Sequence, residues 1–309
     1  VRKEAVIESL DVASIYQVPL FFKNQILDEI ILSHFNLISK PSSLKEWEKN
    51  VVERAINPSR CVKIAVVGKY ITLQDAYKSI YEALAHAGIA NDTRVEIKKV
   101  DSEEIEKKGV DKLLGDVCGV LVPGGFGSRG IEGKIKAIEF VRKNRIPFLG
   151  LCLGMQCAVI EFSRNVCGIR GANSTEFNRN ARYPVVSLLE EQKGIKELGG
   201  TMRLGIYPCA IKKNTLAFRL YGKTTIFERH RHRYEFNNKY KKALEKNGMV
   251  FSGIYKKKGL VEIIELKNHP YFIAVQFHPE FKSKPDIAHP LFSGFISAAL
   301  KKSLDLTPL

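Results

Sequence analysis

The chain has 309 residues, 45% of them hydrophobic, which is enough for one large domain or two ordinary ones with a substantial core. No run approaches the roughly 18 apolar residues of a membrane span, and the first twenty residues lack the layout of a secretory signal, so we expect a cytoplasmic protein. The net charge of +16 comes from basic residues spread along the chain, which favours a solvated surface over a nucleic-acid site.

Residues 1–57 do not share the pattern of the rest of the chain. The run Ser14–Phe35 has a helical apolar rhythm after Pro19, and the run Ser42–Ile56 begins with a serine and a glutamate spaced like a capping box. We therefore expect two helical stretches, followed by a linker at Asn57–Arg60.

From about residue 62, short β-rich runs alternate with amphipathic segments. The expected strands are Val62–Gly68, Thr93–Val100, Val117–Gly125 and Ile146–Gly150, and the expected helices are Asp75–Ala87, Ser102–Leu114 and Ile131–Lys143. This alternation implies right-handed crossovers and a parallel sheet covered by helices on both faces. Ligands of such sheets collect at the carboxyl ends of the strands.

The second half carries glycine and proline between strand-like runs, as antiparallel strands do. Such runs occur at Asn180–Gly194 and Gly199–Ile211, a hairpin is expected from Lys258–Leu266 and Tyr271–Phe277, and a final helix from His289–Leu304. We expect an α/β fold with an open, mostly parallel central sheet, helices on both faces and a smaller antiparallel excursion.

Cys152 stands between Gly150 and Gly154, where a strand-like run gives way to a helical one. A sharp turn at this point would clash with bulky neighbours, and glycine avoids the clash. A helix that begins at Leu153 would direct its unpaired N–H groups and positive end at the sulfur, which favours the thiolate. The pattern predicts a nucleophile, although a lone cysteine near a helix start is commonly structural.

The six cysteines show no close pairing, so we expect neither a disulfide framework nor a metal site. A cysteine nucleophile needs a base and a group that orients the base. His278 and Glu280 follow an expected strand directly and should leave the sheet at the edge where Cys152 lies. Histidine, with an unperturbed pKa of about 6.5, suits proton transfer near neutrality. The alternative interpretation is that His278 is a hydrogen-bonded loop residue and Glu280 a solvent-exposed one, with no catalytic role.

The reaction also needs N–H donors for the developing negative charge, which form an oxyanion hole. The glycine-rich run Val122–Gly130 ends a neighbouring strand, and the N–H of Leu153 supplies a second donor. Such a run could instead cradle a nucleotide phosphate. It matches neither G-x-x-x-x-G-K-[ST] nor G-x-G-x-x-G, so phosphate binding ranks lower.

The candidate nucleophile, base and oxyanion hole lie in three motifs, which follow one another as "PGGFG", "GLCLGMQ" and "QFHPEF". Motifs of this kind in this order resemble those of the triad (class I) glutamine amidotransferases, which have a flavodoxin-like fold. The further motifs "VGKYITLQDAYKSIYEAL", "ANSTEF", "GGTMRLG" and "ERHRHRYEFN" are similar to the glutaminase domain of CTP synthases, and the similarity covers nearly all of residues 58–300. The resemblance implies that residues 1–57 are a remnant of an amidoligase domain with the interdomain linker, and that residues 58–309 are the glutamine amidotransferase domain.

The resemblance also implies the roles of the catalytic residues. Cys152 would form a glutamyl thioester, His278 would act as general base and acid, and Glu280 would orient His278. The N–H groups of Gly125 and Leu153 would bind the oxyanion.

For glutamine itself, the resemblance implies contacts from Gly125, Leu153, Gly154, Met155, Gln156, Glu176 and Arg233. Glu176 would accept the α-ammonium group, and Arg233 would bind the α-carboxylate, where a guanidinium fork fits best. Without the resemblance, a surface ion pair would be the preferred interpretation of these two residues.

In that family the amidoligase domain uses ATP and Mg to phosphorylate UTP, and ammonia from glutamine then yields CTP in pyrimidine biosynthesis. GTP activates the glutaminase. We expect no cofactor in the glutaminase domain, L-glutamine and the amidoligase domain as partners, no nucleic acid or membrane, and a homo-oligomeric full-length enzyme.

Only the tail of the amidoligase domain is expected here, because Glu8–Phe22 resembles its last stretch. Asp11 and Val12 match positions near the ATP site. The segment between Leu188 and Gly199 is shorter than in some relatives. The sequence therefore does not decide whether a GTP-sensing lid is present. Two other functions also stay open: a basic nucleotide- or nucleic-acid-binding module with an incidental cysteine, and another cysteine hydrolase that would not require Glu176 and Arg233.

Overall fold

The computed structural model describes residues 2–40, 42–71, 73–189 and 202–306. Its centre is a nine-stranded sheet in the order β2-β1-β3-β4-β12-β11-β10-β7-β8. The strands of this sheet are β1 (Arg60–Gly68), β2 (Thr93–Asp101), β3 (Gly119–Val122), β4 (Phe148–Leu151), β7 (Arg203–Ile211), β8 (Thr225–His232), β10 (Met249–Tyr255), β11 (Leu260–Leu266) and β12 (Phe272–Val275).

The strands from β2 to β12 pair in parallel, and those from β12 to β8 pair in antiparallel fashion. The expected fold class is therefore confirmed, and the antiparallel strands continue the central sheet. A second, small sheet contains β5 (Ala172–Ser174), β6 (Tyr183–Ser187) and β9 (Glu235–Phe236). In this small sheet β5 and β6 are parallel, and β6 and β9 are antiparallel.

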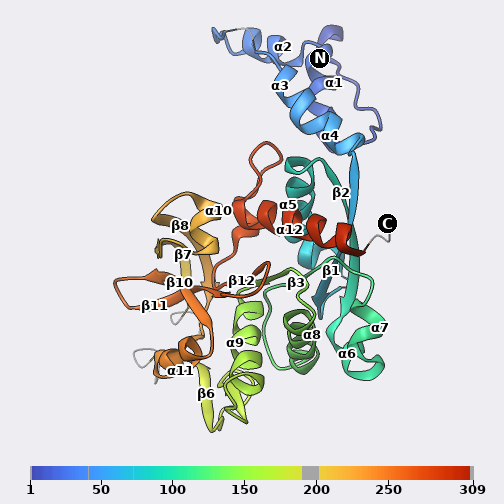
Figure 1. The fold of residues 1–309 in the computed structure, drawn as a ribbon. Helices are drawn as coiled ribbons and strands as arrows, with labels where there is room; N and C mark the ends of the chain where they lie inside the picture. The colour runs from blue at the N-terminus through green and yellow to red at the C-terminus, as the bar shows by residue number, and fades with distance from the viewer. Residues whose placement is uncertain (1, 41, 72, 190–201, 307–309) are drawn as a thin grey trace.

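Helices cover both faces of the parallel half, as expected (Figure 1). One apolar cluster includes residues of α6 (Ser102–Lys108), α7 (Val110–Leu114), α8 (Ile131–Lys143) and α9 (Leu153–Asn165). The other includes residues of α5 (Lys78–Ala90), α10 (Leu216–Tyr221) and α12 (Pro290–Leu306). The strands between these clusters are buried on both sides, which explains their continuous apolar runs.

Two sequence expectations about helices differ from the structure. The segment Ser102–Leu114 forms two helices, because Gly109 has a φ of 84°, a conformation that favours glycine and interrupts the helix. The helix after Ser42 begins at Lys45, and its N-cap residue, Leu44, provides no side-chain cap. The capping box instead occurs at Ser14, before a short 3₁₀ turn.

Residues 2–57 form a helical lobe that lies beyond α5 and β2 (Figure 1). It contains α1 (Val18–Asn24), α2 (Leu27–His34), α3 (Lys45–Trp47) and α4 (Glu53–Ile56), with a π-helical turn between α3 and α4. The Tyr16 hydroxyl contacts Glu82 of α5 at 3.0 Å, and the indole N–H of Trp47 donates to the carbonyl of Tyr16 at 2.7 Å. The first bond links the lobe to α5, and the second lies within the lobe and ties Trp47 to Tyr16.

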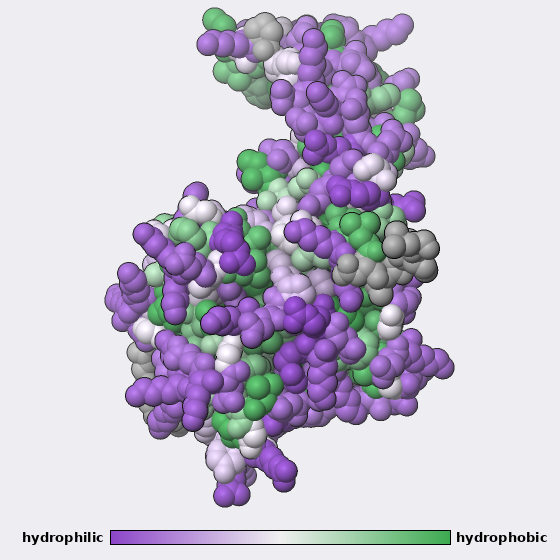
Figure 2. Space-filling view, in the orientation of Figure 1, coloured by the Kyte–Doolittle hydropathy of each residue, from purple (hydrophilic) through white to green (hydrophobic). Residues whose placement is uncertain are grey.

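The remaining helix, α11 (Lys241–Lys246), precedes β10. Hydrophilic residues cover most of the face in Figure 2, as expected for a chain of net charge +16. Within the described ranges, no helix is long and apolar enough to cross a membrane.

Candidate active site

Cys152 occupies a sharp turn between β4 and α9. Its backbone angles are φ 50° and ψ −101°, which a non-glycine residue rarely adopts. The turn needs glycine on both sides: a Cβ at Gly154 would overlap the carbonyl oxygen of Val122, and a Cβ at Gly150 would lie 2.8 Å from the Cβ of Ala274. The sulfur-bearing residue therefore projects from the carboxyl end of β4 at the start of a helix, the geometry of a nucleophile elbow.

His278 reaches Cys152 because β4 and β12 are parallel neighbours, with Leu151 opposite Val275. The N–H of Cys152 donates to the carbonyl of Val275 at 2.7 Å, so the two strand ends are joined at the turn. A Cβ at Gly124 would lie 3.0 Å from Cε1 of His278 and 3.5 Å from Cβ of Cys152, so both side chains border one glycine. Residue 124 therefore has to be small for the side chains of Cys152 and His278 to lie side by side.

Glu280 orients the imidazole of His278. Nδ1 of His278 lies 2.8 Å from Oε1 of Glu280, which leaves Nε2 for proton exchange with the sulfur. Burial disfavours the charged imidazole, but the Cys152 sulfur and then the Glu280 carboxylate outweigh it and raise the pKa of His278 to about 11. The site therefore favours a protonated His278 beside the sulfur of Cys152.

Sequence reasoning did not single out Gln276, which stands in the same motif as His278. Its amide nitrogen lies 3.7 Å from Sγ of Cys152, and its amide oxygen accepts from Nε2 of Gln156 at 3.2 Å. Gln156 also contacts the carbonyl of Tyr234 at 3.1 Å. The signal that could have identified Gln276 is its position in the strand. Val275 pairs with Leu151, so the next residue, Gln276, lies opposite Cys152.

A cavity of about 370 Å³ opens over the sulfur, a suitable size for one small ligand. It brings together five of the predicted residues, Gly125, Cys152, Gln156, Glu176 and Arg233. Four further lining residues were not predicted, namely Phe126, Met202, His232 and Tyr234. The cavity wall thus contains the thiol of Cys152, one acidic residue and one arginine.

The two charged residues of the cavity are far apart in the sequence. Oε1 of Glu176 accepts the N–H of Gly127 at 2.8 Å, which ties the carboxylate to the glycine-rich turn. Burial raises the pKa of Glu176 against the opposing effects of this bond, Lys69 and Arg233. A carboxylate and a guanidinium that face one cavity suit a zwitterionic ligand, because each binds the opposite charge.

The remaining predicted residues lie behind or away from the cavity. Leu153 backs the glycine-rich turn, since a Cβ at Gly125 would lie 3.3 Å from Cδ2 of Leu153. Gly154 packs on β3, and Met155 is 1% exposed within the core. Asp11 and Val12 belong to the helical lobe. Ligand contacts by these residues stay predictions, and most of the segment between Leu188 and Gly199, at residues 190–199, falls outside the described residues.

The motifs "GGTMRLG" and "ERHRHRYEFN" meet in a buried ionic network beside the cavity. Arg203 forms ion pairs with Glu235 at 3.0 Å and Glu262 at 2.9 Å. Burial raises the pKa of Glu235 to about 8 and of Glu262 to about 7, against the opposing effect of Arg203. The rings of His230 and His232 lie 2.9 Å apart between their nitrogens, and burial lowers both pKa values. This network supports the cavity wall that carries His232.

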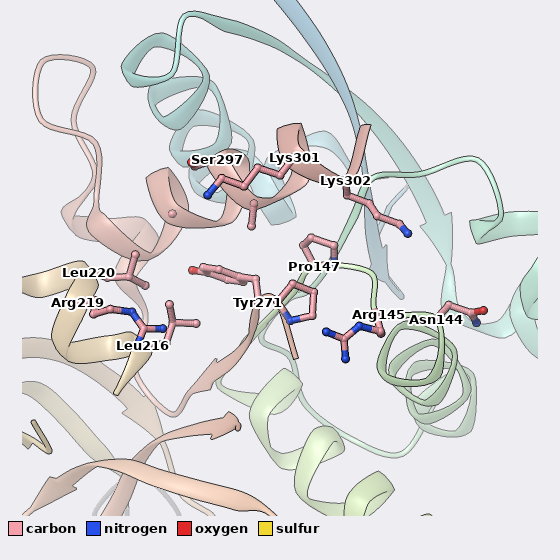
Figure 3. Close-up of a pocket in the computed structure, with 13 residues that line it drawn as sticks. Asn144, Arg145, Pro147, Leu216, Arg219, Leu220, Tyr271, Ser297, Lys301 and Lys302 are labelled. Atoms are coloured by element: carbon pink, nitrogen blue, oxygen red, sulfur yellow. The ribbon is translucent and has the colours of Figure 1, made fainter. Parts of the chain in front are cut away.

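A larger cavity, of about 570 Å³, is shown in Figure 3. Pro147 and Tyr271 line it, and they precede β4 and β12, so it lies at the amino ends of the strands whose carboxyl ends carry Cys152 and His278. Its charged residues are all basic, namely Arg145, Arg219, Lys301 and Lys302. It shares no lining residue with the cavity that contains Cys152.

Comparison with known proteins agrees with this geometry. Residues 72–298 match the family described as glutamine amidotransferase class-I. The CTP synthase of Caldanaerobacter subterraneus subsp. tengcongensis is 56% identical over 305 residues, which are 99% of this chain and 57% of that protein. The CTP synthase of Carboxydothermus hydrogenoformans is 54% identical over 301 residues, 97% of this chain and 56% of that protein.

A solved structure described as the Trypanosoma brucei CTPS glutaminase domain with bound acivicin is 41% identical, with a TM-score of 0.73. The match covers 78% of this chain and 94% of that chain. The chain spans less than three fifths of the length of the two curated relatives. The matched family range contains Cys152, His278 and Glu280. The chain therefore belongs to the class I glutamine amidotransferases and, among them, to the CTP synthase family.

Proposed function

We propose that this chain hydrolyses L-glutamine to glutamate and ammonia through a thioester on Cys152. The observation that carries the proposal is the cavity that joins Cys152 to Glu176 and Arg233. Free glutamine has an ammonium, a carboxylate and a side-chain amide. One ligand of this kind can pair with both charged residues and present its amide to the sulfur.

The chemistry follows from the groups around the sulfur. The thiolate of Cys152 attacks the amide carbon, and the N–H groups of Gly125 and Leu153 bind the resulting oxyanion. His278 gives its proton to the amide nitrogen, the C–N bond breaks and ammonia leaves. Water then attacks the thioester, His278 takes its proton, and the C–S bond breaks to give glutamate and the free thiol. The sum is glutamine and water to glutamate and ammonia.

For the full-length enzyme we propose that the ammonia passes to an amidoligase domain, which uses ATP and Mg to convert UTP to CTP. We also propose that GTP activates the glutaminase and that the full-length enzyme is a homo-oligomer. Names of the relatives support this extension. We assign residues 1–57 to the tail of that domain and its linker, and residues 58–309 to the glutaminase domain.

The surface of the helical lobe supports this assignment. Half of the exposed large hydrophobic residues of the described chain lie in it, namely Val6, Leu10, Ile15, Ile26, Ile31, Phe35, Leu37 and Ile38. Exposed apolar surface of this extent commonly marks an interaction site. A lobe that normally packs on its parent domain explains the exposure.

Labelling with a glutamine-like diazo ketone, followed by peptide mass spectrometry, tests the glutaminase proposal. We expect one covalent adduct, on Cys152, and protection by excess L-glutamine. The variant Cys152→Ser should take up no label and release no glutamate from glutamine.

Cys157 provides an internal control, because it is fully buried in α9, four residues after Leu153, and burial raises its pKa to about 12. Equal labelling of Cys157, or an adduct on Cys152 that glutamine does not prevent, would contradict the proposal. Protection by other amides but not by glutamine would instead indicate a different cysteine hydrolase.

A further inference from the structure

Lys134 is a fully buried lysine in a helix whose buried face is otherwise apolar. It lies in α8, and its side chain is 0% exposed. The other buried residues of α8 are Ile131, Gly133, Ile135, Ala137, Ile138 and Val141. An apolar side chain of similar length would fill the same space without the cost of burying an ammonium group. The presence of lysine therefore requires a reason other than packing.

The ammonium group of Lys134 has no hydrogen-bond partner within the described part of the chain. Long basic side chains usually extend their charge to water, and this one does not. Burial lowers the pKa of Lys134, and the lysine Lys69 opposes its charge further. The charged form of this group is thus disfavoured at its position, as is common for groups that act in function.

The position of Nζ points to the reaction. It would lie 3.8 Å from a Cβ at Gly125, on the glycine-rich turn that should bind the oxyanion. The charged or ionisable groups that interact with it are Cys157, Lys69, Cys152 and Glu176. Lys69 is already engaged, because its Nζ donates to the carbonyl of Phe126 in the same turn. Lys134 has no such bond and lies behind the turn.

We propose that Lys134 is a positioning residue for the glutaminase reaction, and that its ammonium group supports the Gly125 turn as negative charge develops on the substrate's amide oxygen. The inference rests on the proposed function of the same site. It assigns a role to a side chain that lies outside the cavity and that no motif identified.

The physical reason is a difference between two states. Without substrate, the buried ammonium has no hydrogen-bonded anion among the described residues, and Cys152 and Glu176 act on it only through space. When the tetrahedral intermediate forms, an oxyanion appears on the other side of a residue that has no side chain, and the attraction becomes strong because water is excluded. An interaction that gains strength only during the reaction raises kcat and leaves KM nearly unchanged.

The variant Lys134→Met tests this, because methionine keeps the length of the side chain and removes the charge. We expect kcat for glutamate release to fall by about 10- to 100-fold, with KM within about twofold of the wild type. Stability to urea should be equal or higher, since replacing an unpaired buried charge by an apolar group removes a penalty. A structural role alone would instead lower stability.

Ile138→Met is the matched control, one turn further along α8 at an equally buried position. It should leave kcat unchanged. An unchanged kcat in Lys134→Met, or an equal loss in both variants, overturns the inference.

A second measurement does not depend on glutamine. The pH midpoint for alkylation of Cys152 by iodoacetamide should rise in Lys134→Met, because a positive charge that favours the thiolate has been removed. Absence of glutamate release by the wild type would refute the proposed function, and an unchanged midpoint would then refute the role of Lys134 separately.

Discussion

At the scale of single residues, the pair His278 and Glu280 determines how the site responds to pH. Because the pKa of His278 is raised in the folded state to about 11, the interaction stabilises the fold fully below the unfolded value of about 6.5. Its contribution is lost as the pH rises from there through about 11. The variant Glu280→Gln removes one of the groups that raise this pKa.

We therefore expect the difference in unfolding free energy between the wild type and Glu280→Gln to be full near pH 6.5 and to narrow once the pH passes the lower His278 pKa of the variant, and kcat to fall by about 100-fold or more. Urea unfolding at about pH 6.5, 8 and 9.5 measures the first effect. Glu245→Gln makes the same chemical change at an exposed position and should show no such trend. A difference that widens with pH would be the opposite of this expectation.

Residue patterns predicted Cys152 with its two glycines, because a tight turn restricts local sequence strongly. They also predicted His278 and Glu280, because a strand that ends in a histidine directs it to the rim of the sheet. Gln276 and Lys134 escaped prediction for a physical reason. The role of a buried glutamine or lysine depends on the groups that surround it, and these groups come from distant segments of the chain.

At the scale of elements, the contact between α9 and β3 depends on Gly154. A Cβ there would overlap the carbonyl oxygen of Val122, which is backbone and cannot rotate away. We expect Gly154→Ala to separate the helix from the strand, to lower the free energy of unfolding by about 1–3 kcal/mol and to reduce labelling of Cys152. Urea unfolding and the labelling rate measure the two effects.

Gly294→Ala is the matched control, because Gly294 also lies in a helix, α12, and the Cβ added there would overlap only the end of the flexible Leu220 side chain, with the Tyr271 ring next at 3.3 Å. The leucine can shift, and alanine favours a helix more than glycine does. This variant should therefore be nearly neutral. A loss as large as that of Gly154→Ala would show that the fixed carbonyl is not the cause.

Local patterns defined several elements well. The bounds of α8 agree with the expected Ile131–Lys143, and the hairpin of β11 and β12 was expected. The order of the strands was less accessible, because β12 joins β4 across more than a hundred residues. Arg203 likewise meets Glu235 and Glu262 only in the folded chain. Hydrophobic periodicity predicts whether a segment forms a helix or a strand. Which distant segments pair depends on the packing of the complete core.

At the scale of the whole molecule, both apolar clusters lie between Val62 and Leu300, and none of the residues that the structure describes in the helical lobe belongs to them. The lobe adds contacts on α5 but contributes nothing to the sheet. We expect a chain that begins at residue 58 to fold, with unchanged circular dichroism of the α/β part and an unchanged rate of Cys152 labelling. A lower melting temperature would reflect the lost contacts of Tyr16 on α5.

The intact chain, labelled under the same conditions, is the reference for that experiment. If the shortened chain were insoluble or its Cys152 unreactive, the lobe would be part of the folding unit and the proposed division at residue 57 would be wrong.

The adjacency of β4 and β12 has an evolutionary consequence. Cys152 and His278 are fixed by two touching strands, whereas Glu176 and Arg233 both belong to the long stretch of chain inserted between those strands. Under the proposed function, the residues that break the amide bond and the residues that select the substrate are thus encoded in different stretches of the gene. Mutation can change the residues proposed to select the amide while Cys152 and His278 keep their spacing.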